Sequence, residues 1–520
     1  MSDTTPSSTT ASADALADVL VIGAGPTGLT LACDLARRGV DVRVIERFDR
    51  PSVASRGKGL QPRSLEILDD LGVADDILTR GATKLPVRMI NADGTVVDRE
   101  PIAAPIPDPG TTPYPELLWI AEFDVEGPLR DRLALDGVRV EFATTATALD
   151  QHDNHVVVHV DGPRGPQSIR ARWVVGADGG KSTVRRCLGL SFDGFTMDDY
   201  WYLGDLRLEG LDHGRQYILP TTEGMIGLTP LPTTDIWQWQ STIKAGTELE
   251  EPSLRLYQRL LDKHLGTGRV TLTEATWLSL YRANVRLASR YRVGRVFLAG
   301  DAAHAHSPAG AQGMNTGIQD SWNLAWKLDA VLAGADESLL DTYEEERRPV
   351  AAAVLELSTS RMRKFVDTAT DGADGVNEGL AGMGGEVTTG LAIGYPASSL
   401  SLDGIRAGRA PYATGLRGPG FAGSTFDLFR GPHWTILVFS DDETSTEPFA
   451  GLPTDVHVHR IGTGAILDPQ GTATSRFKTD PDTVILVRPD GYVAAHVPNL
   501  GADRVRDHMQ RLTNRQPLPA

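Results

Sequence analysis

DVLVIGAGPTGLTLACDLARRGVDVRVIE, residues 18–46, contains a strand, a helix and a second strand in its hydrophobic pattern. A short β-branched run ends in Gly23, which is typical of a buried strand. Apolar residues then recur at helical spacing from Leu29 to Ala36, and Gly39 is placed to end the helix. VDVRVIE follows as a strand. The crossover favours parallel, buried strands.

Gly23–Gly28 matches the pattern G-x-G-x-x-G between the first strand and the helix. Gly23 permits the tight turn, Gly25 lets a pyrophosphate approach the backbone, and Gly28 lets the helix pack on the strand. The helix N-terminus offers N–H groups and partial positive charge to phosphates. Glu46, at the end of the second strand, can accept hydrogen bonds from both ribose hydroxyls. The unit predicts a dinucleotide site and leaves FAD and NAD open.

The composition limits the classes of protein to consider. At 520 residues the chain is long enough for two or three domains. The formal net charge of −17 argues against a nucleic-acid partner, because an acidic surface repels phosphate backbones. No apolar run approaches the roughly 20 residues that span a bilayer, so no membrane partner is expected. Two cysteines are too few for a disulfide scaffold, and we expect a cytoplasmic protein.

The first two thirds of the chain contain two alternating kinds of pattern. Residues 1–17 are Ser/Thr/Ala-rich and are expected to form a disordered tail and not a signal peptide. Residues 18–190 together with 285–365 contain the strands and long helices of a discontinuous nucleotide-binding domain. Residues 191–284 are richer in aromatics and alternate as antiparallel strands do, which predicts a substrate domain. The Pro-rich crossover 85–117 is expected to contribute to that domain.

The last third of the chain is expected to hold a linker and a separate domain. Residues 366–418 are rich in Gly, Ala and Ser and show weak periodicity, which favours a linker. Residues 419–520 again alternate strands and helices and predict a small α/β domain.

A second motif, RVFLAGDAAHAHSPAGAQGMNTGIQDSWNLAWKL, runs from Arg295 to Leu328. It begins like a buried strand and ends like a helix, which we expect to start at residue 316. His304 and His306 raise the question of a metal site. Because HAH lacks carboxylate or Cys partners at ligand spacing, we predict no metal and interpret both as polar loop residues near a cofactor.

Three separated motifs follow one another in the order G-x-G-x-x-G, VVGADGGKSTVRR (174–186) and the loop after Arg295. Across residues 18–350 this order resembles the para-hydroxybenzoate hydroxylase-like flavoproteins, the class A FAD-dependent aromatic monooxygenases. SRGKGLQPRSLEIL and LLDTYEEERRP also resemble signatures of this family. The chain is most similar to hydroxylases of aromatic polyketides and phenols from antibiotic biosynthesis, which carry a thioredoxin-like C-terminal domain. Residues 419–520 resemble that domain but lack Cys-x-x-Cys, so they cannot perform dithiol redox chemistry.

The resemblance implies an α/β fold with three parts. These are a Rossmann-like FAD-binding domain, an inserted antiparallel-sheet substrate domain and a C-terminal thioredoxin-like α/β domain. The second match to G-x-G-x-x-G, GPGFAG (418–423), does not lie between a strand and a helix of a second βαβ unit, so NAD(P)H is implied to dock transiently as a co-substrate that reduces FAD. Dioxygen then gives a C4a-hydroperoxyflavin, whose distal oxygen is transferred to an electron-rich aromatic carbon. The protein positions a small aromatic substrate and excludes water.

The same resemblance implies which residues hold FAD. Asp301 accepts hydrogen bonds from the ribitol hydroxyls, because an ionised Asp is acceptor-only. Pro308 shapes the wall beside the flavin ring, and the positive end of the next helix faces the pyrimidine edge. Relatives often have Gly where this chain has Ala311, and Gln as a ribitol contact where it has Glu122. The expected FAD-binding residues are Gly23, Gly25, Pro26, Thr27, Gly28, Glu46, Arg47, Arg56, Asp178, Gly300, Asp301, Pro308, Gly310, Gly313, Met314 and Asn315.

The substrate pocket is expected between this loop and the 191–284 sheet. Candidates for its lining are Trp201, Tyr217, Trp237 and Trp239, although aromatic residues also favour strands for packing reasons alone. No catalytic residue is assigned. A homodimer is considered as the assembly.

Three other functions stay open at this level. WQWQ (237–240) resembles part of the Trp-x-Trp-x-Ile-Pro motif of flavin-dependent halogenases, but Ser241 and Thr242 follow it. The same scaffold can support Baeyer–Villiger insertion or another flavin oxidoreductase reaction. It can also serve a non-enzymatic flavin- or drug-binding protein. The prediction is an NAD(P)H- and dioxygen-dependent aromatic hydroxylase.

Overall fold

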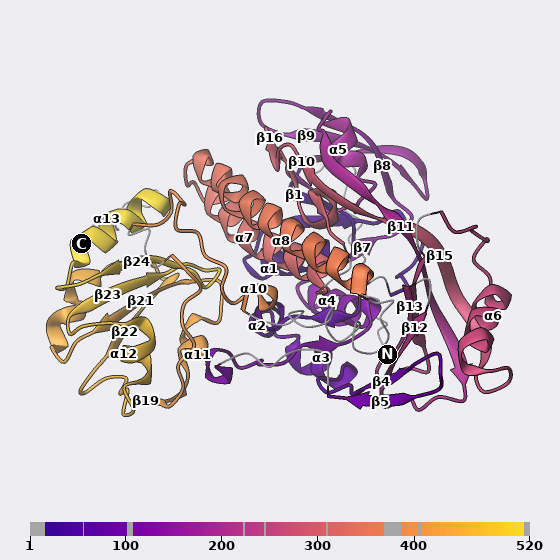
Figure 1. Ribbon diagram of the computed structural model, residues 1–520. Coiled ribbons are helices and arrows are strands. Elements are labelled where there is room, and N and C mark those ends of the chain that lie inside the picture. The colour runs from indigo at the N-terminus through magenta and orange to yellow at the C-terminus, as the bar shows by residue number, and fades with distance from the viewer. Residues whose placement is uncertain are drawn as a thin grey trace, which may run out of the picture.

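The computed structural model contains two large sheets and a smaller C-terminal one (Figure 1). The C-terminal sheet lies at one end of the molecule and the second large sheet lies at the other. Two long helices, α7 (Gln312–Leu332) and α8 (Asp341–Thr368), run between them. This is the predicted α/β class. The structure describes residues 16–55, 57–100, 108–221, 224–243, 246–307, 310–368, 386–402 and 407–513.

The first sheet is built around β1 (Leu16–Ile22), which pairs in parallel with β10 (Gly165–Gly176) and β2 (Val42–Ile45). The strand order is β16-β17-β10-β1-β2-β7. β1 is a nearly continuous apolar run because helices cover the parallel sheet and bury its strands. The outer strands are β7 (Val140–Glu141), β8 (Thr145–Gln151), β9 (Val156–Gly162), β16 (Arg292–Val293) and β17 (Val296–Leu298).

Helix α1 (Pro26–Arg37) follows β1 directly and packs between α7 and α4 (Glu122–Leu135). Its buried apolar face continues the core of the first sheet. The observed β1–α1–β2 unit is the one that residues 18–46 predict. Shorter elements around it are β3 (Gly59–Leu60), α2 (Pro62–Asp70), α3 (Ala74–Arg80), β6 (Leu118–Trp119) and α5 (Thr183–Cys187).

The second sheet has the order β18-β15-β11-β14-β13-β12-β4-β5 and is antiparallel except where β12 meets β4. Its two longest strands, β11 (Phe192–Glu209) and β15 (Thr271–Ala288), pair along their length. Helix α6 (Leu254–Leu265) packs its buried Leu and Tyr side chains into the core cluster of this sheet. The other strands are β4 (Val87–Ile90), β5 (Val96–Arg99), β12 (Gln216–Thr221), β13 (Gly224–Pro230), β14 (Trp237–Ile243) and β18 (His304–Ala305).

The C-terminal sheet has the order β22-β21-β23-β24 and a thioredoxin-like mixture of directions. β21 (Trp434–Phe439) is parallel to β22 (Val456–Ile461) and antiparallel to β23 (Thr483–Val487). Further elements of residues 386–513 are α10 (Glu386–Thr389), β19 (Leu416–Gly418), β20 (Phe421–Gly423), α11 (Thr425–Phe429), α12 (Thr472–Phe477), β24 (Val493–Val497) and α13 (Ala502–Thr513).

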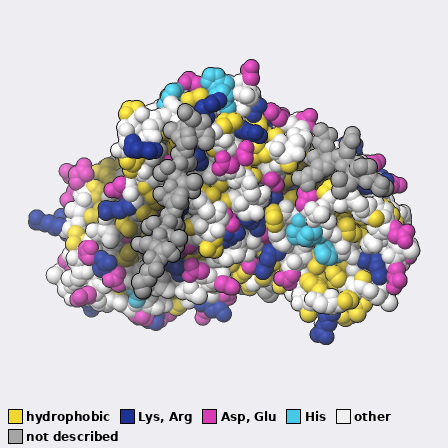
Figure 2. Space-filling view, turned by 180° about the vertical axis from the view of Figure 1, so that it is seen from behind, with side chains coloured by type: hydrophobic (Ala, Val, Ile, Leu, Met, Phe, Trp, Pro, Cys, Tyr) yellow, Lys and Arg dark blue, Asp and Glu magenta, His cyan; other side chains and the backbone are white. Residues whose placement is uncertain are grey.

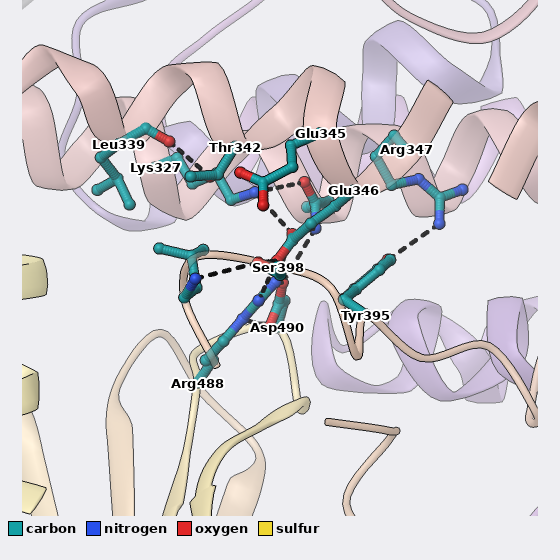
Figure 3. A network of polar contacts seen from close by, with 12 residues as sticks. Lys327, Leu339, Thr342, Glu345, Glu346, Arg347, Tyr395, Ser398, Arg488 and Asp490 are labelled. Atoms are coloured by element: carbon teal, nitrogen blue, oxygen red, sulfur yellow. Dashed lines mark hydrogen bonds and ion pairs between the residues drawn. The ribbon is translucent and has the colours of Figure 1, made fainter. Parts of the chain in front are cut away.

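A buried network of charges joins the C-terminal domain to α7 and α8 (Figure 3). Glu346 on α8 accepts a hydrogen bond from Lys327 on α7 at 2.8 Å and another from Arg488 Nη2, just after β23, at 3.0 Å. Arg488 also pairs with Asp490, which accepts from the indole of Trp326 at 3.0 Å. The four charged side chains are almost fully buried. The C-terminal domain is therefore docked by ion pairs that have no access to water.

The described surface carries both signs of charge. Figure 2 shows basic and acidic side chains interspersed over the face that it presents. Among the described residues, no helix is long and apolar enough to cross a membrane.

Candidate cofactor and substrate site

A cavity of about 1270 Å³ lies where the first sheet, the second sheet and the start of α7 meet. One end is lined by the glycine loop after β1 and by Glu46, and the other by side chains of β11, β13, β14 and β15. A volume of this size exceeds the roughly 300–1,000 Å³ of a typical ligand pocket, so it has room for more than one molecule.

The glycine loop has the shape that a pyrophosphate needs. Gly23 has φ +110°, and a Cβ there would lie 2.3 Å from the carbonyl oxygen of Ala177. A Cβ on Gly28 would lie 2.0 Å from the carbonyl oxygen of Gly23. A Cβ on Gly25 would meet nothing within 4 Å, because this residue faces the cavity. Two glycines therefore close the turn, and the third keeps a space open at the positive end of α1.

Glu46 is held in place at the end of β2 by the glycine loop itself. Its Oε2 accepts from Ala24 N at 2.9 Å and its Oε1 from Phe48 N at 3.0 Å. A carboxylate has about four lone-pair positions, so acceptor capacity is left for ribose hydroxyls. Arg47, which is exposed at the cavity rim, lies over the Phe48 ring at 4.9 Å.

Asp178 also lines the cavity and has one unused oxygen. Its Oδ2 accepts from Thr183 N at 2.6 Å and from Val184 N at 3.2 Å, which fixes the start of α5. Its Oδ1 is buried and has no hydrogen-bond partner among the described residues. A buried oxygen without a donor is costly, so the geometry fits a ligand that supplies one.

The loop after β17 places Asp301 in the cavity wall. Gly300 has φ +59°, and a Cβ there would lie 2.6 Å from Thr27 Oγ1. Thr27 also lies 2.3 Å from the Cβ position of Gly317, so α7 crosses the start of α1 at close range. This approach brings Asp301 to the same cavity as the glycine loop.

Helix α7 begins at Gln312, and the predicted start at residue 316 is wrong. Ala311 adopts a left-handed conformation, φ +53° and ψ +42°, which turns the chain into the helix four residues earlier. Gly310, Gly313 and Met314 line the cavity as this first turn passes it.

Asn315 lies in the same turn, but its side chain contacts the backbone and not the cavity. Its amide donates to Gly59 O at 2.9 Å and to Ala311 O at 2.6 Å, and its Oδ1 accepts from Gln61 N at 2.8 Å. Asn315 thus fixes the β3 segment against α7, and it is not among the residues that line the cavity.

Ala311→Gly is expected to stabilise the protein by about 0.5–1 kcal/mol. The left-handed conformation costs an L-residue roughly 1–2 kcal/mol, which exceeds the entropy that glycine adds to the unfolded chain. Urea unfolding measures the difference. Ala325→Gly, in the buried interior of the same helix, is the matched control and is expected to destabilise by about 1 kcal/mol or more. Equal losses in both variants would contradict the expectation.

Of the four aromatic candidates for substrate binding, the structure brings the side chain of one to the cavity. The indole of Trp201 lines it, whereas the ring of Tyr217 packs 5.9 Å from Trp237 on the other face of the sheet. Trp237 and Trp239 are fully buried on the opposite face of the sheet, where Trp239 stacks on Tyr257 of α6 at 4.8 Å. Successive side chains of a strand point to opposite faces, so it is Gln238 and Gln240 of β14 that face the cavity.

His304 and His306 form a buried chain of hydrogen bonds. His306 Nε2 lies 2.7 Å from His304 Nδ1, and His304 Nε2 lies 2.6 Å from Asp320 Oδ2. Arg347 donates to the other oxygen of Asp320 at 2.8 Å. Among the described residues, no group of three His, Cys, Asp or Glu side chains has the arrangement of a metal site. His306 lines the cavity, and its partners behind it fix the loop.

Glu122 is in the cavity wall as an anchor for the backbone. Its Oε2 accepts from Gly57 N at 3.0 Å, an interaction for which a carboxylate is well suited. One turn further along α4, burial raises the pKa of Glu126 to about 8, with Glu122 adding to the effect and Arg130 opposing it.

Several lining residues have no sequence signal as site residues. Lys58 and Gln61 lie within SRGKGLQPRSLEIL, and this motif could have indicated that their segment borders the site. Trp277 and Gln238 lie on strands of the second sheet, and the sequence alone does not show which face of that sheet borders the cavity. Two expected residues, Arg56 and Pro308, lie outside the residues that the structure describes.

Comparisons with known proteins agree with this site. Residues 16–358 match the FAD binding domain family, and residues 405–515 match the family described as aromatic-ring hydroxylase, C-terminal. A flavin-dependent monooxygenase of Mycobacteroides abscessus is 38% identical over 91% of this chain and 96% of its own. 6-Methylpretetramide 4-monooxygenase of Streptomyces rimosus is 33% identical over 95% of this chain and 93% of its own.

A solved structure shows the same arrangement of domains. Aklavinone-11 hydroxylase, in a ternary complex with FAD and aklavinone, has a TM-score of 0.81 and 28% identity over 96% of this chain and all of that one. The glycine loop, the open space at Gly25 and the unpaired oxygen of Asp178 fit FAD. The chain belongs to the FAD-dependent monooxygenases that carry an aromatic-ring hydroxylase C-terminal domain and take electrons from NAD(P)H.

Proposed function

We propose that this enzyme hydroxylates a polycyclic phenol of the aromatic polyketide type. The observation that supports the proposal most directly is the single cavity of about 1270 Å³, which joins the glycine loop to a wall of aromatic and amide side chains. Two of the relatives named above are a 6-methylpretetramide 4-monooxygenase and an aklavinone-11 hydroxylase solved with aklavinone. A role in antibiotic biosynthesis follows from the same likeness.

The residues of the first sheet hold the cofactor in this proposal. The N–H groups at the start of α1 bind the pyrophosphate, Glu46 binds the ribose, and Asp301 accepts from the ribitol hydroxyls. The positive end of α7, beside Gly313 and Met314, would stabilise negative charge on the flavin. When bound, FAD supplies the redox and oxygen chemistry.

The residues of the second sheet hold the substrate. Trp201 and Trp277 offer flat apolar surfaces to fused rings, while Gln238 and Gln240 offer donors and acceptors to the oxygens on those rings. The sheet and α7 together exclude water from the reacting atoms. Dioxygen as the oxygen source, a homodimer and a cytoplasmic location stay predictions.

Isotope labelling tests the function. The purified enzyme is supplied with FAD, NADH or NADPH, and ¹⁸O-labelled dioxygen, and 6-methylpretetramide, aklavinone and 2-naphthol serve as substrates. One labelled oxygen in a product with its rings intact supports hydroxylation. A labelled ester or lactone would instead show ring-oxygen insertion, and tight binding without NAD(P)H oxidation would show a binding protein.

Asp301→Ala is expected to lower the affinity for FAD about tenfold to a hundredfold. The substitution removes charge-assisted hydrogen bonds to ribitol, which are worth roughly 1.5–3 kcal/mol. Flavin titration of the apoprotein measures it. Asp301→Asn keeps an acceptor oxygen in the same place and is expected to lose less. Unchanged affinity in Asp301→Ala would place the ribitol elsewhere.

A further inference from the structure

Lys58 occupies the boundary between the two halves of the cavity. Its neighbours Gly57 and Gly59 lie against the start of α7, where their Cβ positions would be 3.8 Å from Met314 Cε and 3.2 Å from Ala311 Cβ. The backbone of Lys58 is therefore beside the proposed flavin edge. Its side chain extends away from α7 to the second sheet.

The ammonium of Lys58 has fewer partners than donors. Nζ donates to Thr229 Oγ1 of β13 at 3.0 Å and lies 3.4 Å from Gln240 Oε1 of β14. Lysine has three N–H donors, so one is left to point into the cavity that Lys58 lines. Among the described residues, no carboxylate lies within ion-pair distance of it.

The surroundings of Lys58 disfavour an unpaired cation. Burial lowers its pKa to about 8, and the carboxylate of Asp205 on β11 partly opposes the effect. Asp205 is itself committed to Ser55 N and to Trp277 Nε1, both at 2.6 Å from Oδ2. Burial raises the pKa of Asp205 to about 6, and Glu122 of α4 adds to that rise. Near neutral pH, Lys58 can thus both give and take a proton.

Two tryptophan side chains lie on the same face of the second sheet as the groups that Lys58 contacts. Trp201 of β11 and Trp277 of β15 line the same part of the second sheet as Thr229 and Gln240. Aromatic side chains of this kind bind flat fused rings, and the amide and amine groups on the same face of the sheet bind oxygen atoms. Lys58 takes part in none of the ion pairs of the described residues.

We propose that Lys58 is a catalytic residue that ionises the phenol of the substrate and pairs with the resulting phenolate. The inference rests on the proposed hydroxylation of a phenol. The O–H bond of the phenol breaks, its proton forms a third N–H bond on the neutral amine, and no oxidant or reductant is consumed. The negative charge raises the electron density at the ring carbons ortho and para to the oxygen. These are the positions at which an electrophilic oxygen is accepted.

Difference spectroscopy tests the pairing without turnover. The probe is 2-hydroxyanthraquinone, a polycyclic phenol whose absorption moves to longer wavelength on ionisation, added to the FAD-loaded enzyme between pH 5 and pH 9. In the wild type the phenol is expected to ionise at least one pH unit lower than in free solution. Lys58→Met is expected to abolish this shift, and Lys58→Arg, which keeps a cation, is expected to retain it. The surface variant Lys84→Met is the control and is expected to match the wild type.

Turnover then separates catalysis from binding. With the compound that the wild type hydroxylates, Lys58→Met is expected to lower kcat about a hundredfold or more, since general acid–base catalysis contributes about 10²–10⁴. Its FAD affinity is expected to be unchanged. Wild-type spectra that stay those of the neutral phenol overturn the proposal, and so does a Lys58→Met variant that retains the shift. If oxygen is incorporated while the bound phenol stays neutral, the role of Lys58 is wrong but the proposed function holds. If the phenol ionises and no oxygen is incorporated, the proposed function is wrong but the pairing with Lys58 holds.

Discussion

Gly25→Val is expected to lower the affinity for FAD by more than about a hundredfold and to leave the apoprotein folded. Its backbone is extended, φ −76° and ψ −179°, which any residue adopts, and a Cβ meets nothing within 4 Å. The valine methyls then occupy the space proposed for the pyrophosphate, and the phosphates lose several hydrogen bonds worth roughly 1.5–3 kcal/mol each. Flavin titration and thermal unfolding of the apoprotein measure the two effects separately.

Gly28→Val is the matched control, three residues further along the same helix. Its Cβ would lie 2.0 Å from the backbone oxygen of Gly23, so the helix must move away from the turn. This variant is expected to lose both stability and FAD. If Gly25→Val bound FAD as the wild type does, the pyrophosphate would have to lie away from this loop.

Glu346→Gln is expected to destabilise the protein by about 3–5 kcal/mol, as is usual when one partner of a buried ion pair is removed. Lys327 and Arg488 would keep their charges without the carboxylate that both contact. Chemical unfolding measures the loss. The C-terminal domain is expected to become sensitive to protease first, because Arg488 belongs to it.

The control for this change is its neighbour, Glu345→Gln. Glu345 is exposed and accepts from Ser399 in the way that Glu346 accepts from the buried Ser398. Its loss is expected to cost about 1 kcal/mol or less, because water can replace these exposed hydrogen bonds. Equal effects of the two substitutions would show that the buried charges do not hold the domains together.

Glu346 also gives the docking of the domain a defined pH dependence. Burial opposes its ionisation, but Arg488 and Lys327 outweigh burial and hold the pKa of Glu346 below its usual value of 4.5. A lowered pKa in the folded state means that the stabilisation is complete above pH 4.5 and is lost as the pH falls below it. Unfolding measured from pH 7 downward is expected to show this loss in the wild type and not in Glu346→Gln.

Local patterns were sufficient to predict the first sheet and its glycine loop. The signals for β1, α1, β2 and the glycine loop lie within residues 18–46, and strand, turn and helix there depend on neighbours in sequence. The family and its FAD cofactor followed from three motifs that are each short and contiguous. The start of α7 could not be predicted in the same way, because it depends on the left-handed conformation of Ala311.

The orientation of the side chains of β14 shows why the residues of the substrate wall were harder to predict. A period of two places Trp237 and Trp239 on one face and Gln238 and Gln240 on the other. Which face borders the cavity depends on α6, which covers the two indoles and lies later in the chain. The large aromatic residues suggested a ligand-binding wall, but packing against a helix in the protein core explains their presence equally well.

Lys58 was missed for a related reason. Its contacts Thr229 and Gln240 are 171 and 182 residues away in sequence. The motif SRGKGLQPRSLEIL marks its segment, but nothing local indicates that the amine of Lys58 is buried against β13 and β14. Its environment exists only after the second sheet has closed over the segment before β3.

The buried ion pairs also set an order of events during synthesis. Arg488 lies 142 residues after Glu346, so at roughly 5–20 residues per second it leaves the ribosome about 7 to 28 seconds later. During that interval we expect the side of α7 and α8 that the C-terminal domain covers to be exposed to water. Trp326 and Glu346 on that side then lack their contacts with Asp490 and Arg488. The same helix α7 begins at the cofactor cavity, so we expect the nascent chain to retain FAD only once its last domain has emerged.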